Sequence, residues 1–249
     1  MAKITPEILT GELKAICGEN LRSVVLYGSA AAGDSVKTSD HNVLVVLERL
    51  ETEDLAALAG LSARWCKEGN HAPLLFTRKG LARSADVFAV EFADIKQTHK
   101  TLHGEDYFAA MEIDHAHLRL ELERELKSKL LLLRENFLAA KSSRKELDRL
   151  MVSSVSSFLT LFKAALRLYG EVPPVKKMDA LPMLSKHVKL DEEAFSLVWG
   201  LKEGRKIPDA ASPQVFMRYL KTVQDTTDAV DLWIQNSEKG QEKRAVPTN

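Results

Sequence analysis

The sequence predicts an α+β protein in which a small mixed β-sheet with helices is followed by an all-α helical bundle. Short apolar segments of strand length alternate with helical patterns up to Gly104, and no strand pattern follows Ile113. A hydrophobic fraction of 45% is sufficient to build buried cores. We therefore expect a first domain at residues 1–110, a helical domain at residues 111–236 and a flexible polar tail at residues 237–249.

The first domain opens with a helix and a strand. Pro6–Gly18 carries apolar residues at helical spacing and stops at a glycine, and Ser23–Tyr27 is a short apolar run typical of a buried strand. The small residues of Gly28–Ser39 predict a turn with one helical turn. The remaining elements are expected, in chain order, at Val43–Leu47 (strand), Glu53–Lys67 (helix), Pro73–Thr77 (strand), Arg78–Ser84 (short helix) and Val87–Ile95 (strand). This order predicts a small mixed sheet with helices on one face.

The helical domain is expected to contain long amphipathic helices followed by shorter ones. Gly170 and the Pro173-Pro174 pair end the second long helix, because proline cannot continue a helix. The expected helices are Leu118–Lys141, Glu146–Tyr169, Lys177–His187, Asp191–Glu203 and Pro213–Gln235.

Charge and cysteine content narrow the class of partner. Lys+Arg and Asp+Glu number 35 each, so the chain lacks the basic excess with which proteins neutralise nucleic-acid phosphates. A nucleotide, a small molecule or a protein is the expected partner. Cys17 and Cys66 lie far apart and outside any Cys/His cluster, which argues against structural zinc and a disulfide framework. We find neither an apolar segment of membrane-spanning length nor a secretory signal, and we expect a cytoplasmic protein.

The most informative segment is VVLYGSAAAGDSVKTSDHNVLVV, residues 24–46. A strand ends at Gly28 and Ser29, and Asp40 and Asn42 open the next strand. Residues two apart on a strand point to the same face, so positions 40 and 42 could share one metal ion. Glycine lets a backbone approach phosphates closely, and a serine hydroxyl with nearby N–H groups can hydrogen-bond to them.

This segment resembles the signature of the DNA polymerase beta-like nucleotidyltransferase superfamily, in particular the small-molecule or minimal type with a C-terminal helical domain. There, a strand ends in Gly-Ser, and an Asp-x-Asp or Asp-x-Glu pair opens the next strand about a dozen residues later. The resemblance implies a nucleoside triphosphate as substrate and Mg²⁺ as cofactor. It implies that Gly28 and Ser29 bind the phosphates and that Asp40 and Asn42 are the metal ligands.

The superfamily also carries a third carboxylate on a later strand, often as the base that receives the proton of the substrate hydroxyl. We assign this position to Glu91, which alternates with Val90 and Phe92 in the expected fourth strand. Asp40 and Glu91 are therefore the expected catalytic residues. His41 would point away from the face of Asp40 and is not expected to be a ligand.

The sequence departs from the superfamily at Asn42, where a neutral amide stands in place of a carboxylate. The loss of one negative charge weakens a site for divalent ions. Two functions therefore stay open. The first is weakened transfer of a nucleoside monophosphate from a nucleoside triphosphate to a hydroxyl of a small molecule or protein. The second is a catalytically inactive nucleotide-sensing or protein-interaction module.

Three other sequence patterns bear on function. Gly28–Ser35 has the glycine spacing of a Walker A phosphate loop, but Asp34 stands where the phosphate-binding lysine belongs. His99 and His103 are spaced for one helix face, yet no third metal ligand accompanies them. An exposed apolar stripe on the expected helix Leu118–Lys141 would favour a homodimer.

Overall fold

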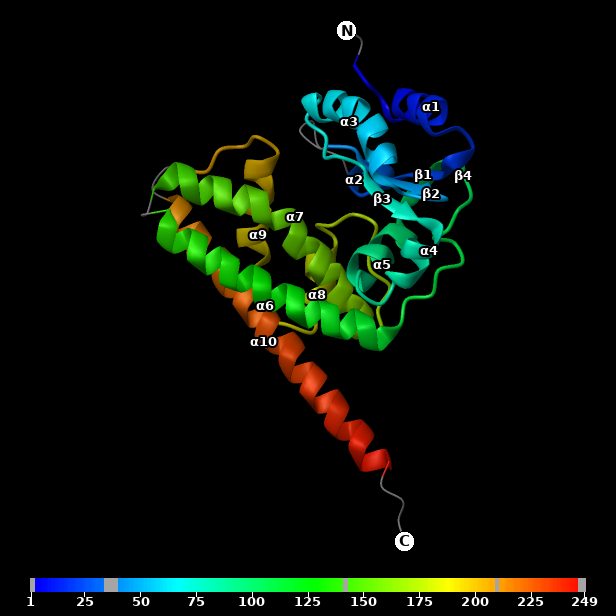
Figure 1. The fold of residues 1–249 in the computed structure, drawn as a ribbon. Coiled ribbons are helices and arrows are strands. Elements are labelled where there is room, and N and C mark those ends of the chain that lie inside the picture. The colour runs from blue at the N-terminus through cyan, green and yellow to red at the C-terminus, as the bar shows by residue number, and fades with distance from the viewer. Residues whose placement is uncertain (1–2, 34–39, 141–142, 209–210, 246–249) are drawn as a thin grey trace. The chain divides into compact units, whose positions relative to one another are not determined.

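A computed structural model describes residues 3–33, 40–140, 143–208 and 211–245 (Figure 1). The chain divides into two compact units, Met1–Asp114 and His115–Asn249. Each unit has its own hydrophobic core. Two residues used in the sequence analysis lie outside the described residues. They are Asp34, which decides the Walker A comparison, and Ser39, where the expected turn ends.

The first unit is built on a mixed sheet with the strand order β3-β2-β1-β4. The strands are β1 (Leu21–Tyr27), β2 (Asn42–Leu47), β3 (Leu74–Thr77) and β4 (His99–Gly104). β1 is antiparallel to both β2 and β4, and β2 is parallel to β3. The predicted mixed sheet is confirmed.

Helices pack on both faces of this sheet. They are α1 (Pro6–Cys17), α2 (Ser29–Ala32), α3 (Thr52–Lys67), α4 (Arg78–Arg83) and α5 (Ala89–Gln97), together with the 3-10 turn η1 (Gly18–Asn20). One core cluster joins the sheet to α1 and α3 through Leu9, Leu61 and Trp65. A second cluster joins the opposite face to α4 and α5 through Leu81 and Phe92. The prediction of helices on one face is wrong, because consecutive apolar residues of β1 and β2 are buried on both sides.

Helix α5 occupies the segment in which we expected the fourth strand, Val87–Ile95. Its buried residues recur at helical spacing, since Ala89 and Val90 are followed one turn later by Phe92 and Ala93. The prediction of a strand at Val87–Ile95 is wrong, because it interpreted this helical spacing as the alternation of a strand. The strand that pairs with the free edge of β1 is β4, which follows α5 directly in the chain.

The second unit is all-helical, as predicted. Its helices are α6 (His115–Ala139), α7 (Arg144–Leu168), α8 (Ala180–Leu184), α9 (Glu192–Lys202) and α10 (Ser212–Ala245). α7 contacts each of the other four helices and carries the largest set of buried side chains. The ring of Phe162 on α7 lies 5.2 Å from that of Phe195 on α9. α10 continues to Ala245, past Gln235 where we expected it to end, because the intervening Glu, Lys and Gln residues favour helix.

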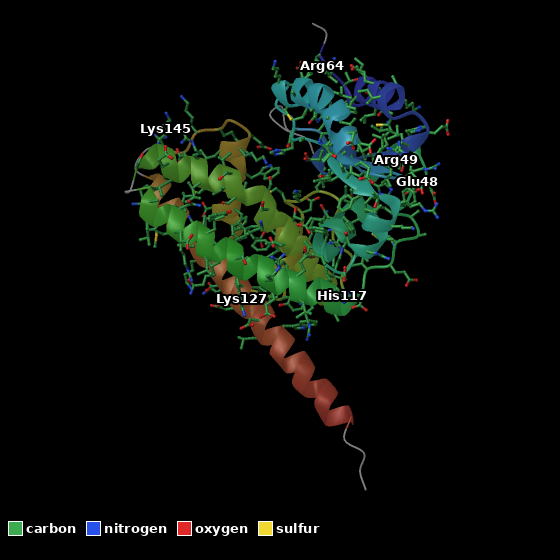
Figure 2. The ribbon with its side chains drawn as sticks, viewed as in Figure 1. Glu48, Arg49, Arg64, His117, Lys127 and Lys145 are labelled. Carbon is green, nitrogen blue, oxygen red and sulfur yellow. The ribbon has the colours of Figure 1, made fainter. Side chains whose placement is uncertain are left out.

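Helix α7 is the one segment among the described residues that is long and apolar enough to cross a membrane by length and composition alone. It is an exception to the sequence expectation, which found no segment of that length. Within its most apolar window, 56% is buried inside the unit, as in the core helix of a helical domain. Most charged side chains are exposed or partly exposed, with Glu121 and Lys163 of the second unit as buried exceptions. Figure 2 labels six exposed residues: Glu48, Arg49, Arg64, His117, Lys127 and Lys145.

Candidate functional site

Three strand ends meet at one edge of the sheet in the first unit. Tyr27, the last residue of β1, is paired with Asn42, the first residue of β2, and with His99, the first residue of β4. The Gly28-Ser29 pair follows β1 directly, and Asp40 stands two residues before Asn42. The antiparallel pairing thus brings the two halves of the sequence motif to the same edge.

Gly28 has a backbone conformation that few other residues adopt. Its φ of 75° and ψ of −154° lie in a region populated almost only by glycine. A Cβ atom at this position would also lie 3.2 Å from the amide nitrogen of Asn42. Ser29 then begins the short helix α2, which Gly33 closes in the left-handed conformation. The absence of a side chain at Gly28 therefore lets the Asn42 amide group approach the backbone closely.

The Asp40 side chain is held from the loop between α3 and β3. Its Oδ2 atom lies 3.2 Å from Nε2 of His71. One residue earlier in that loop, Asn70 accepts a hydrogen bond of 2.9 Å from the backbone N–H of His41. Trp65 of α3 donates its indole N–H to the His71 carbonyl at 2.9 Å. These bonds fix the backbone on both sides of the Asp40–His71 pair.

Tyr27 links the acidic residues of the site. Burial raises the pKa of Tyr27 to about 12, and the negative charges of Asp40 and Glu91 add to this effect. Its hydroxyl group is therefore protonated at neutral pH and available as a hydrogen-bond donor. Asp40 and Glu91 thus lie near enough to Tyr27 for their charges to act on it, although they lie on different elements.

The structure places the expected site residues on elements that differ in part from the prediction. Asp40 precedes β2 rather than belonging to it, and Asn42 is the first strand residue. Glu91 lies on helix α5 and not on a strand, because the apolar residues around it recur at helical spacing. Its side chain is exposed. The ring of His41 packs near Trp65, with 6.1 Å between ring centroids.

Sequence reasoning missed the contribution of Tyr27 and His71. The Tyr27 hydroxyl could have been noticed, because tyrosine ends the strand of the motif. Nothing in the sequence marks His71, which lies 31 positions after Asp40 and reaches it through the loop that follows α3.

The donor set for a metal ion is small. Among the described residues, no group of three or more His, Cys, Asp or Glu side chains is arranged to hold a metal ion. Asp40 offers a carboxylate and Asn42 a neutral amide. Mg²⁺ is usually held by one or two carboxylates together with substrate phosphates and water, so Asp40 fits one ion carried in part by a nucleotide. A pair of ions bound in the manner of two-metal enzymes does not fit this set.

The histidines that we considered as a helical pair lie on a strand. His99 and His103 are the first and fifth residues of β4, where side chains four apart are separated by the length of the strand. The ring of His99 interacts at 2.9 Å with both the Ile95 carbonyl and the Asp106 carboxylate. The Asp106 carboxylate also accepts backbone N–H bonds from the turn that follows, so His99 has a structural role.

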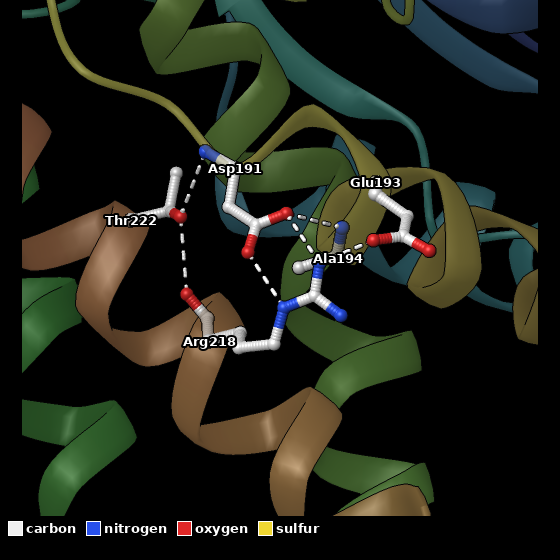
Figure 3. A network of polar contacts seen from close by, with 5 residues as sticks. All are labelled: Asp191, Glu193, Ala194, Arg218 and Thr222. Carbon is white, nitrogen blue, oxygen red and sulfur yellow. Dashed lines mark hydrogen bonds and ion pairs between the residues drawn. The ribbon is translucent and has the colours of Figure 1, made fainter.

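A pocket of ≈ 800 Å³ lies in the second unit, beside the start of α9 and the middle of α10. Arg218, one of the residues that line this pocket, is already hydrogen-bonded to carboxylates. It donates to Asp191 at 2.6 and 2.8 Å and to Glu193 at 2.6 Å (Figure 3). These bonds raise the pKa of Arg218 and lower that of Asp191. Asp191 also caps α9 by accepting the N–H of Ala194 at 3.0 Å. This network stabilises the junction of two helices and leaves Arg218 poorly available to an anionic ligand.

Comparison with known proteins identifies a fold. No family model matches the chain, and no curated protein matches its sequence. Among solved structures, the chain is similar to the spectinomycin adenyltransferase AAD(9) from Enterococcus faecialis, whose structure was determined with ATP and spectinomycin. The TM-score is 0.59 at 13% sequence identity, over 90% of this chain and 98% of that chain. The fold is that of a nucleotidyltransferase.

The similarity to this adenyltransferase structure covers parts of both units of the chain. Since 90% of the chain exceeds the length of the first unit, the similarity extends into the helical unit. The sequence motif, in contrast, lies entirely within the first unit. The predicted combination of a mixed-sheet nucleotidyltransferase domain with a C-terminal helical region is confirmed at the level of fold.

Proposed function

We propose that the first unit binds a nucleoside triphosphate at the Gly28–Asn42 edge and transfers its nucleoside monophosphate to a hydroxyl group. The observation that supports this most directly is the positive-φ glycine packed against the Asn42 amide at the end of β1. The acceptor is a hydroxyl-bearing small molecule, in keeping with the ATP and spectinomycin bound by the structural neighbour.

Each residue of the edge has a role in this proposal. Gly28 lets the backbone approach the phosphates without a side chain in between, and the adjoining N–H groups donate to phosphate oxygens. The Asn42 amide donates beside Gly28. Asp40 holds one Mg²⁺ ion, which neutralises phosphate charge and polarises the phosphoryl group when bound. The protonated Tyr27 hydroxyl donates a further hydrogen bond to the nucleotide.

Glu91 is the proposed base. It is exposed on α5 and acts on the same phenol as Asp40. As the acceptor oxygen bonds to the α-phosphorus, pyrophosphate leaves and the hydroxyl proton passes to the Glu91 carboxylate. Substitution Glu91→Gln is expected to lower the transfer rate by about 10²- to 10⁴-fold, the usual contribution of a general base, without weakening nucleotide binding.

A second function, nucleotide binding without transfer, is favoured by the donor set around Asp40. Asn42 lacks the charge of a carboxylate, and Asp40 is already paired with His71. Both features lower the affinity for a divalent ion, and nucleotide binding through Gly28 does not depend on that ion alone.

The substitution Asn42→Asp distinguishes the two functions. Isothermal titration calorimetry of the four nucleoside triphosphates, with and without Mg²⁺, measures binding, and release of pyrophosphate measures transfer. Restoring the carboxylate is expected to raise Mg²⁺-dependent nucleotide affinity and the transfer rate together. Asn136→Asp, at an exposed position of α6 in the second unit, is the control for an added charge.

The outcomes separate cleanly. Binding by the wild type without turnover, followed by turnover in Asn42→Asp, supports the binding module as the present-day function and the transferase site as its origin. If a folded Asn42→Asp variant shows neither Mg²⁺-dependent binding nor transfer, the assignment of the site is wrong.

A further inference from the structure

Helix α6 carries an apolar stripe on the face that it turns to solvent. Leu120, Leu131 and Leu138 are 56%, 57% and 77% exposed. They are separated by about three and about two turns of the helix, since their spacings are close to whole multiples of 3.6 residues. The three side chains therefore lie on one line, over a length of about 27 Å at a rise of about 1.5 Å per residue. We call this line the α6 stripe.

The α6 stripe lies opposite the face with which the helix packs in its own unit. The buried leucines of α6 project about half a turn away from the stripe, and they are Leu118, Leu122, Leu126, Leu130 and Leu133. A single exposed leucine is ordinary on a soluble protein. Several exposed leucines on one line form a patch of the kind that marks an interaction surface.

We propose that the α6 stripe binds a second copy of this chain, with the two α6 helices antiparallel about a two-fold axis midway between Leu120 and Leu138. In such a contact each residue faces the same pair of positions in both copies. Leu120 of each copy lies against Leu138 of the other, and the two Leu131 side chains meet beside the axis. The contact lies within the second unit and does not depend on the nucleotide site proposed for the first.

The charges beside the leucines select this arrangement. Arg124 and Glu135 flank the α6 stripe on the same side, at about 40° and 60° around the helix from Leu120. The antiparallel pairing brings Arg124 to within about 1.5 Å, along the helix axis, of the level of Glu135 in the second copy. Two ion pairs of opposite sign then flank the leucines. A parallel pairing would instead oppose Arg124 to Arg124 and Glu135 to Glu135, which is unfavourable.

The other charges near the α6 stripe are compatible with this contact. Lys127 is paired with Glu123 at 2.7 Å and with Asp231 of α10 at 2.9 Å, so its charge is compensated before a second copy approaches. Arg124 contacts its neighbour Glu125 at 2.9 Å. An exposed ion pair of this kind contributes little free energy, and the Arg124 guanidinium can therefore turn towards the second copy.

The size of the surface sets the expected strength of the dimer. Helix α10 lies beside α6 (Figure 1), and its Leu232, which is 59% exposed, follows the Asp231 that is paired with Lys127. Even with Leu232, one helix face of this length buries less than the roughly 800 Å² per partner of a standard interface. We therefore expect a reversible dimer with a dissociation constant in the micromolar range.

Sedimentation velocity of the full chain, over about 1 to 200 μM, measures this self-association. The wild type is expected to change reversibly from monomer to dimer across the range. Leu131→Asp places two carboxylates beside the two-fold axis and is expected to lower the dimer affinity at least about tenfold. Leu55→Asp makes the same change at a position of α3 that is 48% exposed, and this control is expected to leave the dimer unchanged.

Exchange of the flanking charges tests the antiparallel pairing itself. Arg124→Glu alone and Glu135→Arg alone each oppose like charges and are expected to weaken the dimer. The double variant restores opposite charges and is expected to recover the affinity of the wild type, with circular dichroism showing that every variant is folded. A chain that stays monomeric at every concentration, or a dimer that Leu131→Asp leaves unchanged, would overturn the proposal. A folded double variant that is no stronger a dimer than either single variant would overturn the antiparallel arrangement.

Discussion

Replacement of Gly28 by alanine is the most direct test of how the sheet edge is built. The conformation of Gly28 lies in a region that costs other residues about 1–3 kcal/mol. Alanine offsets about 0.4–1 kcal/mol of this by lowering the entropy of the unfolded chain. The added Cβ atom would also lie 3.2 Å from the Asn42 amide nitrogen, so that side chain must move. We expect Gly28→Ala to lower the free energy of unfolding by about 2 kcal/mol.

Two other glycines provide matched controls. Gly33 also has a positive φ of 67°, but a Cβ there would meet nothing within 4 Å. Gly33→Ala therefore carries backbone strain without a contact and is expected to cost less than Gly28→Ala. Gly11 lies in helix α1 with open space around it, and Gly11→Ala is expected to stabilise the protein by about 0.5–1 kcal/mol.

Urea denaturation followed by tryptophan fluorescence measures these changes in the first unit. In a background with Trp199→Phe and Trp233→Phe, Trp65 is the only tryptophan that remains of three. Nucleotide affinity is measured in parallel, and an approximately tenfold loss, or 1.4 kcal/mol, is expected for Gly28→Ala. If Gly28→Ala is as stable as Gly33→Ala and binds nucleotide like the wild type, the proposed role of this glycine is wrong.

Three further substitutions test separate parts of the structure. Gly104→Ala would place its Cβ atom 1.8 Å from the carbonyl oxygen of Arg22, so it should cost of order 4 kcal/mol or prevent folding of the first unit, as read by urea denaturation. Asn70→Ala removes a buried group with two hydrogen bonds and should cost about 1–3 kcal/mol in the same assay. Asp191→Ala removes the cap of α9 and should lower the unfolding free energy by about 1 kcal/mol, measured by thermal denaturation. The Arg218 hydrogen bond lowers the pKa of Asp191 in the folded protein. The stability that the Asp191 carboxylate contributes should therefore be complete above about pH 4, the pKa of an unfolded aspartate, and disappear as the pH falls further. A difference in unfolding free energy between wild type and Asp191→Ala that does not change with pH would contradict this prediction.

The local periodicity of apolar residues was sufficient to predict most of the helices and strands. The helices of the second unit were expected within a few residues of their observed bounds, except for the C-terminal end of α10, because a repeat of apolar residues on one helix face depends on sequence alone. For the segment Val87–Ile95, periodicity predicted the wrong type of element. Its short apolar pattern suits either a strand or a helix, and the choice was made by the packing of α5 against the sheet and by the pairing of β4 with β1.

The candidate site shows the same division between sequence and tertiary structure. By itself the sequence determined that a strand ends at Gly28 and that, after a short segment, the next strand starts near Asn42. The pairing of these two strands in the sheet then brings Gly28 and Asn42 together. Only the tertiary structure decided that His71 reaches Asp40 and that Glu91 lies on a helix. The physical reason is that these positions depend on how a helix and a loop distant in sequence pack on the sheet, and no local pattern records that packing.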